Sequence, residues 1–494
     1  AARSQALAAD GDVRDALSAF YAERGQAPVW IDESGRPRRD AYELLSVLEG
    51  AAREGLNPED YEVRALRERM DQAQRTGDGD ETLERSLTAM MLSLAKHLYG
   101  GRVSPRRVGW QSDPPELDLK RVAHEVAAGG GPTQVLGQLA PNEPHYLRLR
   151  ERLQALQALG EREYPDVPSG SVLRPGDRDE RVRLVRERLR AEGYEARPPP
   201  EGPELFDEGL SEAVRAFQHD HGLEVDGSIG VATVRGMRHS LEDHLRRIRW
   251  NMERLRWLPR DRGERHVFVN AAGLNAEVRE GAETIWQRPV VVGQIGWNTP
   301  MFSDRIEGVE LFPDWVVPRT IAREEVAPSL QEDAAWAGRN QFVVIDRSTG
   351  RPVEPGEVDW GSASADDYLF IQRPGTHNPL GEAKLLMPNR LQIYLHGTKD
   401  PAVFEARQRL LSHGCIRVQD VLELTRWLFE GEGRGAEFDA AVAAGERVSL
   451  ELERPVHVDI VYLTTWVDDE GRLQTRPDVY GRDRALCRAL GDCA

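Results

Sequence analysis

Two histidines and one cysteine lie close together in the segment YLHGTKDPAVFEARQRLLSHGCIRVQD, which covers residues 394–420. The whole chain has only 12 histidines and three cysteines among its 494 residues. Cys415 follows His413 and Gly414, with His396 upstream, so polar residues and glycine surround it. A structural cysteine is usually a small buried apolar residue. This combination of residue types therefore indicates a cysteine nucleophile with a histidine base.

A cysteine nucleophile needs a base, a group that orients the base, and hydrogen-bond donors for an oxyanion. His396 fits the base, and Gly397 would let a backbone carbonyl approach its imidazole, because no carboxylate stands at an obvious position. The N–H groups around His413, Gly414 and Cys415 are candidates for the oxyanion hole, and Gly414 permits the unusual backbone geometry that this requires. The next predicted helix begins too far away for its dipole to act strongly on the thiol. We therefore expect an imidazolium partner to lower the pKa of the thiol.

Three neighbouring residues have two interpretations each. His413 either buttresses the loop or transfers protons. Ser412 either forms a local backbone hydrogen bond or contacts the substrate. Tyr394 either packs within its strand or lines the site. The residue types do not decide between these alternatives.

The spacing of apolar residues indicates which elements position the site. Segments before residue 160, such as AYELLSVLEGAAREG and LERSLTAMMLSLAKHLYGG, have helical spacing. After residue 260 the spacing changes to a period of two. The strand candidates are HVFVNAAGLNAEVRE, ETIWQRPVVVG, QFVVID, RLQIYLHG, ERVSLELE and VHVDIVYLTTWVD. His396 ends one of these strands, and Cys415 lies in the loop that feeds the predicted helix DVLELTRWLFEG, with Asp420 as its N-cap.

A linker rich in Pro, Gly and Ser precedes a compact unit at residues 171–240. The unit has three predicted helices and a tight turn at Asp226-Gly227, which only glycine enters without strain. A long helix then runs from Leu241 and ends at Pro259, because proline is disfavoured inside a helix. His219 and His221 are two residues apart and would point to different faces of a helix, so no metal site is expected there.

Composition excludes some classes of protein. Acidic residues outnumber basic ones by 83 to 65, for a net charge of −18, which argues against nucleic acid as a partner. No run of uninterrupted apolar residues is long enough to span a membrane. The chain begins without Met, which fits either a mature exported protein whose signal peptide was removed or an arbitrary boundary. Cys487 and Cys493 are either bridged in an oxidising compartment or two unrelated thiols.

The spacing from His396 through 15 residues to SHGC resembles the signature of the L,D-transpeptidases, which have a YkuD-type catalytic domain. The resemblance extends to PDWVVP, RPGTHNPLGEAKLLMPN, IYLHGT and VYLTTWVDDEGRL. These segments are similar to the large periplasmic Gram-negative branch, which carries a scaffold domain, a small three-helix peptidoglycan-binding domain and a substrate-capping insertion. Some branches have Asn two residues after the cysteine, whereas this chain has Arg417, whose role the resemblance does not define.

The resemblance implies acyl transfer on peptidoglycan stem peptides without a metal or organic cofactor. Cys415 would attack a tetrapeptide donor, release D-Ala and form a thioester, which the side-chain amine of a diaminopimelate acceptor would resolve as a 3→3 cross-link. Carbapenem β-lactams would be covalent inhibitors, proteins of cell-wall synthesis would be candidate partners, and the location would be periplasmic. The alternatives are an L,D-carboxypeptidase that trims tetrapeptides, transfer to an outer-membrane lipoprotein, and a wall-binding protein without activity.

The sequence thus predicts a multidomain α+β protein with a mainly-β catalytic domain. The expected parts are a helical scaffold domain at 1–165, a peptidoglycan-binding-like domain at 171–240, a linker helix at 241–260, the catalytic domain at 261–481, and a tail at 482–494. The capping insertion is expected at about 315–378 and would close over the thioester to limit hydrolysis. We expect substrate contacts from Tyr394, Ser412, Arg417 and Trp315, and catalytic roles for Cys415, His396, Gly397, His413 and Gly414.

Overall fold

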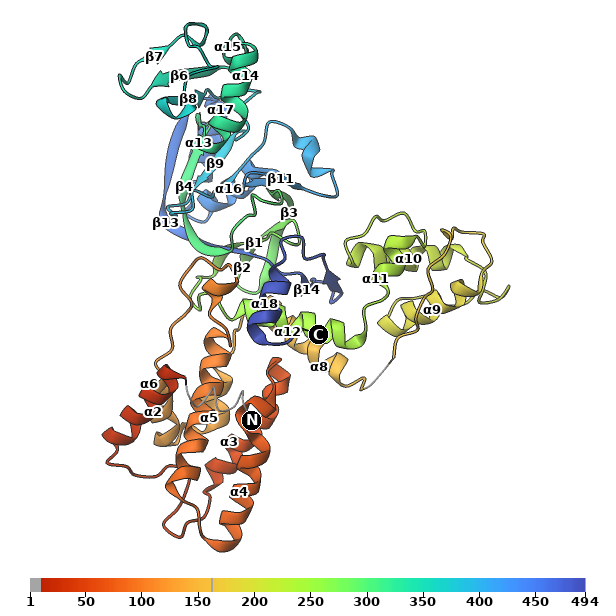
Figure 1. Cartoon of the computed structure of the whole chain (residues 1–494), viewed down its shortest axis with the longest axis vertical. Coiled ribbons are helices and arrows are strands. Elements are labelled where there is room, and N and C mark those ends of the chain that lie inside the picture. Colours follow the sequence, from red (N-terminus) through yellow and green to blue (C-terminus); the bar gives the residue numbers. More distant parts are fainter. Residues whose placement is uncertain (1–9, 161–162, 494) are drawn as a thin grey trace. The chain divides into compact units, whose positions relative to one another are not determined.

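The computed structural model describes residues 10–160 and 163–493, and these divide into two compact units (Figure 1). Unit 1 comprises Ala1–Arg260 and Tyr462–Ala494, and unit 2 comprises Asp261–Val461. The chain is a multidomain α+β protein, helical in its N-terminal region and β-rich in unit 2, as predicted. The expectations about the start of the chain fall on residues 1–9, which lie outside the described residues.

The N-terminal region of unit 1 packs its helices around one apolar core, which includes Leu44, Leu87 and Met90. Its α-helices are α2 (Gly11–Glu23), α3 (Arg39–Glu49), α4 (Val63–Thr76), α5 (Glu81–Gly100), α6 (Leu119–Glu125), α7 (Pro132–Gly137) and α8 (Pro144–Gln157). Short turns of 3-10 or π-helix join them: η1 (Gly50–Glu54), η2 (Pro58–Tyr61), η3 (Pro105–Val108) and η4 (Val126–Gly130).

Three helices follow in the region expected to bind peptidoglycan, with a separate apolar core that includes Val185 and Phe217. They are α9 (Glu180–Glu192), α10 (Glu208–Asp220) and α11 (Val231–Gly236). Gly227 has a φ of 71°, which confirms the tight turn. The next helix, α12 (Leu241–Leu255), ends four residues before the predicted position. The ring of Pro259 would clash with the carbonyl of Leu255, so the helix stops there.

Unit 2 is built on a nine-stranded sheet in the order β11-β3-β12-β10-β9-β4-β13-β1-β2. The strands are β1 (Arg265–Asn270), β2 (Asn275–Glu280), β3 (Glu283–Gly293), β4 (Phe302–Leu311), β9 (Ala383–Leu386), β10 (Leu395–His396), β11 (Leu410–Ser412), β12 (Ile416–Val418) and β13 (Val448–Val461). The helical elements outside the insertion are η8 (Pro401–Phe404), α16 (Val421–Glu430) and α17 (Gly435–Ala444).

Several predicted boundaries in this region are wrong. The strand predicted at ERVSLELE and the first part of the one predicted at VHVDIVYLTTWVD are one strand, β13, whose register shifts between Glu451 and Val456, beside Pro455. A proline cannot donate to the ladder, so it is tolerated at such an irregularity. The predicted strand RLQIYLHG is reduced to β10. Asp420 precedes α16 as expected, but its φ is 52° and its carboxylate accepts from Arg288 Nε at 2.7 Å in place of capping the helix.

Unit 2 is shorter than the predicted catalytic domain of 261–481, because the chain returns to unit 1 at Tyr462. There it forms β14 (Thr465–Val467), β15 (Leu473–Thr475) and α18 (Arg482–Leu490). Asn251 of α12 binds Thr464, since its Oδ1 accepts from the Thr464 backbone N–H at 3.0 Å. A disulfide with Cα atoms 5.0 Å apart joins Cys487 to Cys493, which decides the alternative that the sequence left open.

The insertion is a small folded layer within unit 2. Its four-stranded sheet has the order β5-β8-β6-β7, and an apolar core that includes Val344, Trp360 and Phe370 holds it together. Its elements are β5 (Trp315–Val316), α13 (Arg319–Ile321), η5 (Ala322–Val326), α14 (Ala327–Glu332), α15 (Trp336–Arg339), β6 (Phe342–Asp346), β7 (Pro352–Val353), η6 (Pro355–Glu357), η7 (Ala365–Asp367) and β8 (Tyr368–Gln372). Among the described residues, no helix combines the length and apolar character needed to cross a bilayer.

Candidate active site

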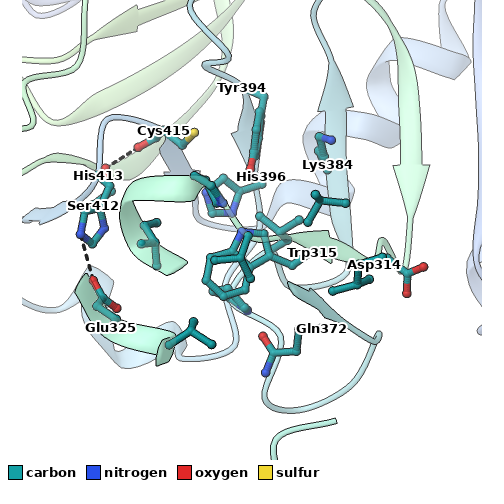
Figure 2. A pocket seen from close by; sticks show the side chains of 18 of the residues that line it. Asp314, Trp315, Glu325, Gln372, Lys384, Tyr394, His396, Ser412, His413 and Cys415 are labelled. Carbon is teal, nitrogen blue, oxygen red and sulfur yellow. Dashed lines mark hydrogen bonds and ion pairs between the residues drawn. The ribbon is translucent and has the colours of Figure 1, made fainter. Parts of the chain in front are cut away.

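A cavity of about 1270 Å³ in unit 2 is lined both by the nine-stranded sheet and by the insertion (Figure 2). It brings together residues predicted from distant parts of the sequence. They are Trp315, Tyr394, His396, Ser412, His413, Cys415 and Arg417. Gly397 and Gly414 do not line the cavity, but each adjoins a residue that does. The insertion therefore forms one wall of the space into which Cys415 and His396 face.

The strand register explains how His396 and Cys415 come to share this cavity. β10 lies between β9 and β12, and His396 stands opposite Lys384 on one side and Arg417 on the other. The Ile416 N–H donates to the Tyr394 carbonyl at 3.1 Å, which places Cys415 beside Tyr394. Cys415 thus sits between β11 and β12, not in a loop that leads directly to α16 as the sequence suggested.

Ser412 and Gly414 shape the turn that presents the thiol. The Ser412 hydroxyl donates to the Cys415 carbonyl at 2.6 Å and accepts from the Gly414 N–H at 3.1 Å. Gly414 has a φ of 114°, a conformation that other residues rarely adopt. Thr299, which sequence reasoning missed, donates to the Gly414 carbonyl at 2.8 Å. The geometry thus favours the local-hydrogen-bond interpretation of Ser412 over substrate contact.

Two backbone N–H groups in this turn are available to a ligand. Within residues 10–160 and 163–493, those of His413 and Cys415 have no hydrogen-bond acceptor. The Gly414 N–H is already used by Ser412. Of the three amides expected to form an oxyanion hole, those of His413 and Cys415 are therefore the ones available for it.

The His413 side chain points away from the thiol, as Figure 2 shows. Its Nε2 lies 3.0 Å from Glu325 Oε1 of the insertion, and its ring meets Trp297 edge-on with centroids 4.9 Å apart. These contacts favour a buttressing role over proton transfer to the substrate. Sequence reasoning missed Glu325 and Trp297, because nothing in the local sequence indicates contact with the SHGC segment.

His396 is buried, with 4% of its surface exposed. Burial and the positive charge of Arg417 lower its pKa to about 3, against a smaller opposing effect of the Gly397 and Leu380 backbones. A Cβ on Gly397 would lie 3.2 Å from the Leu380 carbonyl oxygen, so glycine permits a close backbone approach here. Among the described residues, however, the buried His396 Nδ1 has no hydrogen-bond partner, so the carbonyl expected to orient the imidazole stays a prediction. The imidazole is accordingly neutral in the free protein.

Burial raises the pKa of the Cys415 thiol, and Tyr394 opposes this by hydrogen bonding to the sulfur from its backbone N–H and its hydroxyl. The thiol also lies 3.7 Å from the Gln392 carbonyl oxygen. The expectation that an imidazolium lowers the thiol pKa is therefore wrong for the free protein. The buried site disfavours both charges, so a neutral thiol faces a neutral imidazole.

This charge state predicts how Cys415 reacts with iodoacetamide. Because only the thiolate reacts and the pKa is raised, alkylation at neutral pH should be slower than that of an ordinary cysteine and should rise only above about pH 8.5. Mass spectrometry of the modified chain across this pH range would measure the rate. A rate that is already maximal below neutral pH would reveal a thiolate–imidazolium pair instead.

The other titratable groups do not form a metal site. In the part of the chain that the structure describes, no three His, Cys, Asp or Glu side chains are arranged to hold a metal ion. Lys384 is a further cavity residue that sequence reasoning missed. Its Nζ lies 4.7 Å from the centre of the Tyr394 ring and 3.9 Å from Glu310.

Three family models match separate parts of the chain. The YkuD model, described as an L,D-transpeptidase catalytic domain, matches residues 264–443. A scaffold domain matches residues 15–153, and a "Putative peptidoglycan binding domain" matches residues 178–237. These matches lie within the ranges expected for the corresponding parts.

Individual relatives cover the chain less completely. A Haemophilus influenzae protein named "Putative L,D-transpeptidase" is 26% identical over 241 residues, 49% of this chain. The chain covers 48% of that relative, about half of its length. The amidase CwlM of Mycobacterium tuberculosis, an N-acetylmuramoyl-L-alanine amidase, is 40% identical over 83 residues, 15% of this chain and 20% of that protein. A solved L,D-transpeptidase (Yku) from Stackebrandtia nassauensis is 12% identical to this chain, and the match covers 60% of this chain and 96% of the solved one. Its TM-score of 0.22 is too low to define a shared fold.

Proposed function

Because the chain carries a catalytic domain of the YkuD family of L,D-transpeptidases, together with scaffold and peptidoglycan-binding domains, we propose that it is a cysteine-dependent enzyme that forms 3→3 cross-links between peptidoglycan stem peptides. The observation that carries the proposal is that His396 at the end of β10 and Cys415, in the turn just before the neighbouring strand β12, line one cavity. We place the activity in the periplasm, where this substrate is found. The peptidoglycan-binding domain would hold the enzyme near its substrate.

In the first half-reaction, the Cys415 sulfur attacks the carbonyl carbon between the L-centre of diaminopimelate and D-Ala, while His396 accepts the thiol proton. The negative charge that develops on the carbonyl oxygen would be stabilised by the free N–H groups of His413 and Cys415. The bond from carbon to nitrogen then breaks, and His396 returns the proton to the amine of the departing D-Ala. A thioester remains on Cys415.

In the second half-reaction, the side-chain amine of a diaminopimelate on a neighbouring stem attacks the thioester carbon. His396 accepts a proton from the amine, and the sulfur leaves and regains a proton. Water competes with the amine at this step. The insertion wall, which contributes Trp315 and Glu325 to the cavity, would limit that competition by excluding water from the thioester.

Incubation with purified disaccharide tetrapeptide tests this proposal. Mass spectrometry should detect a cross-linked dimer and free D-Ala in equal amounts. Tripeptide and D-Ala without dimer would instead identify a carboxypeptidase. An unchanged tetrapeptide would contradict both reactions.

We predict that a carbapenem acylates Cys415 once per chain. The strained β-lactam carbonyl imitates the acyl donor, and the thiol would open the ring and stay acylated because no amine acceptor is present. Cys487 and Cys493 are joined in a disulfide and do not compete. Intact-mass measurement after a short incubation should show one adduct, and peptide mapping should locate it in LLSHGCIR. An adduct that persists in Cys415→Ala would disprove this assignment.

A further inference from the structure

A row of titratable residues crosses the catalytic sheet and includes His396, which is neutral between charged neighbours. By strand register, Glu310 of β4 stands opposite Lys384 of β9, Lys384 opposite His396 of β10, and His396 opposite Arg417 of β12. Directly opposite residues on neighbouring strands point to the same face of a sheet. All four side chains accordingly line the same cavity. The base is therefore flanked by a cation on each side.

Arg417 lacks an anionic partner among residues 10–160 and 163–493. Among the described residues, its guanidinium forms no ion pair or hydrogen bond, and its Nε is buried without an acceptor. Asp400 acts on it only through longer-range attraction and is exposed. Arg417 is half-buried, and cations that are partly removed from water are ordinarily paired, because losing solvation of a charge is costly. An unpaired guanidinium beside the nucleophile thus indicates that a ligand supplies the anion.

The other charged residues of the cavity also favour an anionic ligand. The lining has five basic residues against three acidic ones, although the chain as a whole carries a net charge of −18. The acidic residues have partners of their own: Arg447 binds both Glu310 and Asp314, and Glu325 binds His413. The ion pair of Lys384 is long, because its Nζ lies 3.9 Å from Glu310 Oε2. Figure 2 shows Lys384 on one side of the Tyr394 ring, with His396 and the thiol on the other side.

We propose, resting on the proposed function, that Arg417 and Lys384 form the subsite for the C-terminal carboxylate of the donor peptide. Arg417 lies two residues after Cys415, so both side chains face the cavity. The carboxylate of the departing residue is only a few covalent bonds from the carbonyl that Cys415 attacks. A cation beside the thiol reaches this carboxylate only when the departing residue is the last one of the stem. The subsite therefore selects donors that end directly after the scissile bond.

Binding to Cys415→Ala protein tests the subsite without turnover. The probes are the disaccharide tetrapeptide with a free terminal carboxylate and the same compound with a terminal carboxamide. By titration calorimetry the peptide with the free carboxylate should bind about 10- to 100-fold more tightly than the carboxamide peptide. This is the difference in affinity expected from one charge-assisted hydrogen bond. Adding Arg417→Met to the Cys415→Ala protein should remove this preference by lowering the affinity for the carboxylate peptide alone. Arg417→Lys should keep part of the preference. Arg390→Met, an exposed arginine outside the cavity, is the matched control and should leave both affinities unchanged.

Two results would overturn the subsite. One is equal affinity of the Cys415→Ala protein for the two peptides. The other is an equal loss for both peptides on Arg417→Met, which would mean that Arg417 supports the site's structure or the oxyanion. Each result is distinct from failure of the proposed function, which turnover of the tetrapeptide by the wild-type protein measures separately.

Discussion

The Cys415→Ala protein is expected to release no D-Ala and form no cross-linked dimer, with a loss of at least about 10⁴-fold, because the nucleophile is removed. Its fold should be unchanged. The thiol makes a long contact with the Gln392 carbonyl and accepts from Tyr394, whereas the turn that carries it is held by Ser412 and Thr299. The cost in stability should therefore be no more than about 1 kcal/mol.

Circular dichroism and the melting temperature would establish that the variant is folded, and mass spectrometry would quantify its products. Ile285→Ala is a suitable control, because Ile285 is an exposed residue of β3 outside the cavity whose truncation leaves the thiol in place. It should retain most of the wild-type rate. Clear turnover by folded Cys415→Ala would show that another group attacks the substrate.

Much of the fold could be predicted because its elements repeat a clear pattern. The hairpin of β1 and β2 and the long strand β3 follow from alternating apolar residues, and the helices of the scaffold follow from their periodicity. Strands β9, β11 and β12 have only three or four residues each, too few to establish a period. The segment after Val461 also has strand-like alternation, yet alternation does not indicate which unit a strand joins.

The site was predictable in part. Cys415 and His396 are marked by residue type and by their glycine-rich surroundings. Lys384 and Glu325 were missed, since one is brought in by strand register and the other by the fold of the insertion. The charge state of the thiol was predicted wrongly for a similar reason. Burial of both reacting groups depends on the packing of the whole cavity, which the local sequence does not indicate.

The His396→Gln protein should lose about 10³- to 10⁴-fold in the rate of D-Ala release, because one side chain serves as base for the thiol and as acid for the departing amine. Gln keeps a polar side chain in this buried position. Since the pKa of His396 is about 3, the imidazole is neutral near pH 7 and the substitution does not change the charge between Lys384 and Arg417. The effect should therefore report loss of proton transfer, not a changed field.

His413→Gln is the matched control, because this second histidine of the SHGC segment is directed toward Glu325. The rate of D-Ala release by His413→Gln should fall less than about tenfold, because a buttressing contact between two exposed side chains contributes little free energy. The rate should be measured for both variants with the same tetrapeptide, after confirming that the melting temperatures are similar. If His413→Gln lost more activity than His396→Gln, the roles of the two histidines would have to be exchanged. The turn would then have to reorient in the complex, because in the free protein the His413 ring is held by Trp297 and Glu325, away from the thiol.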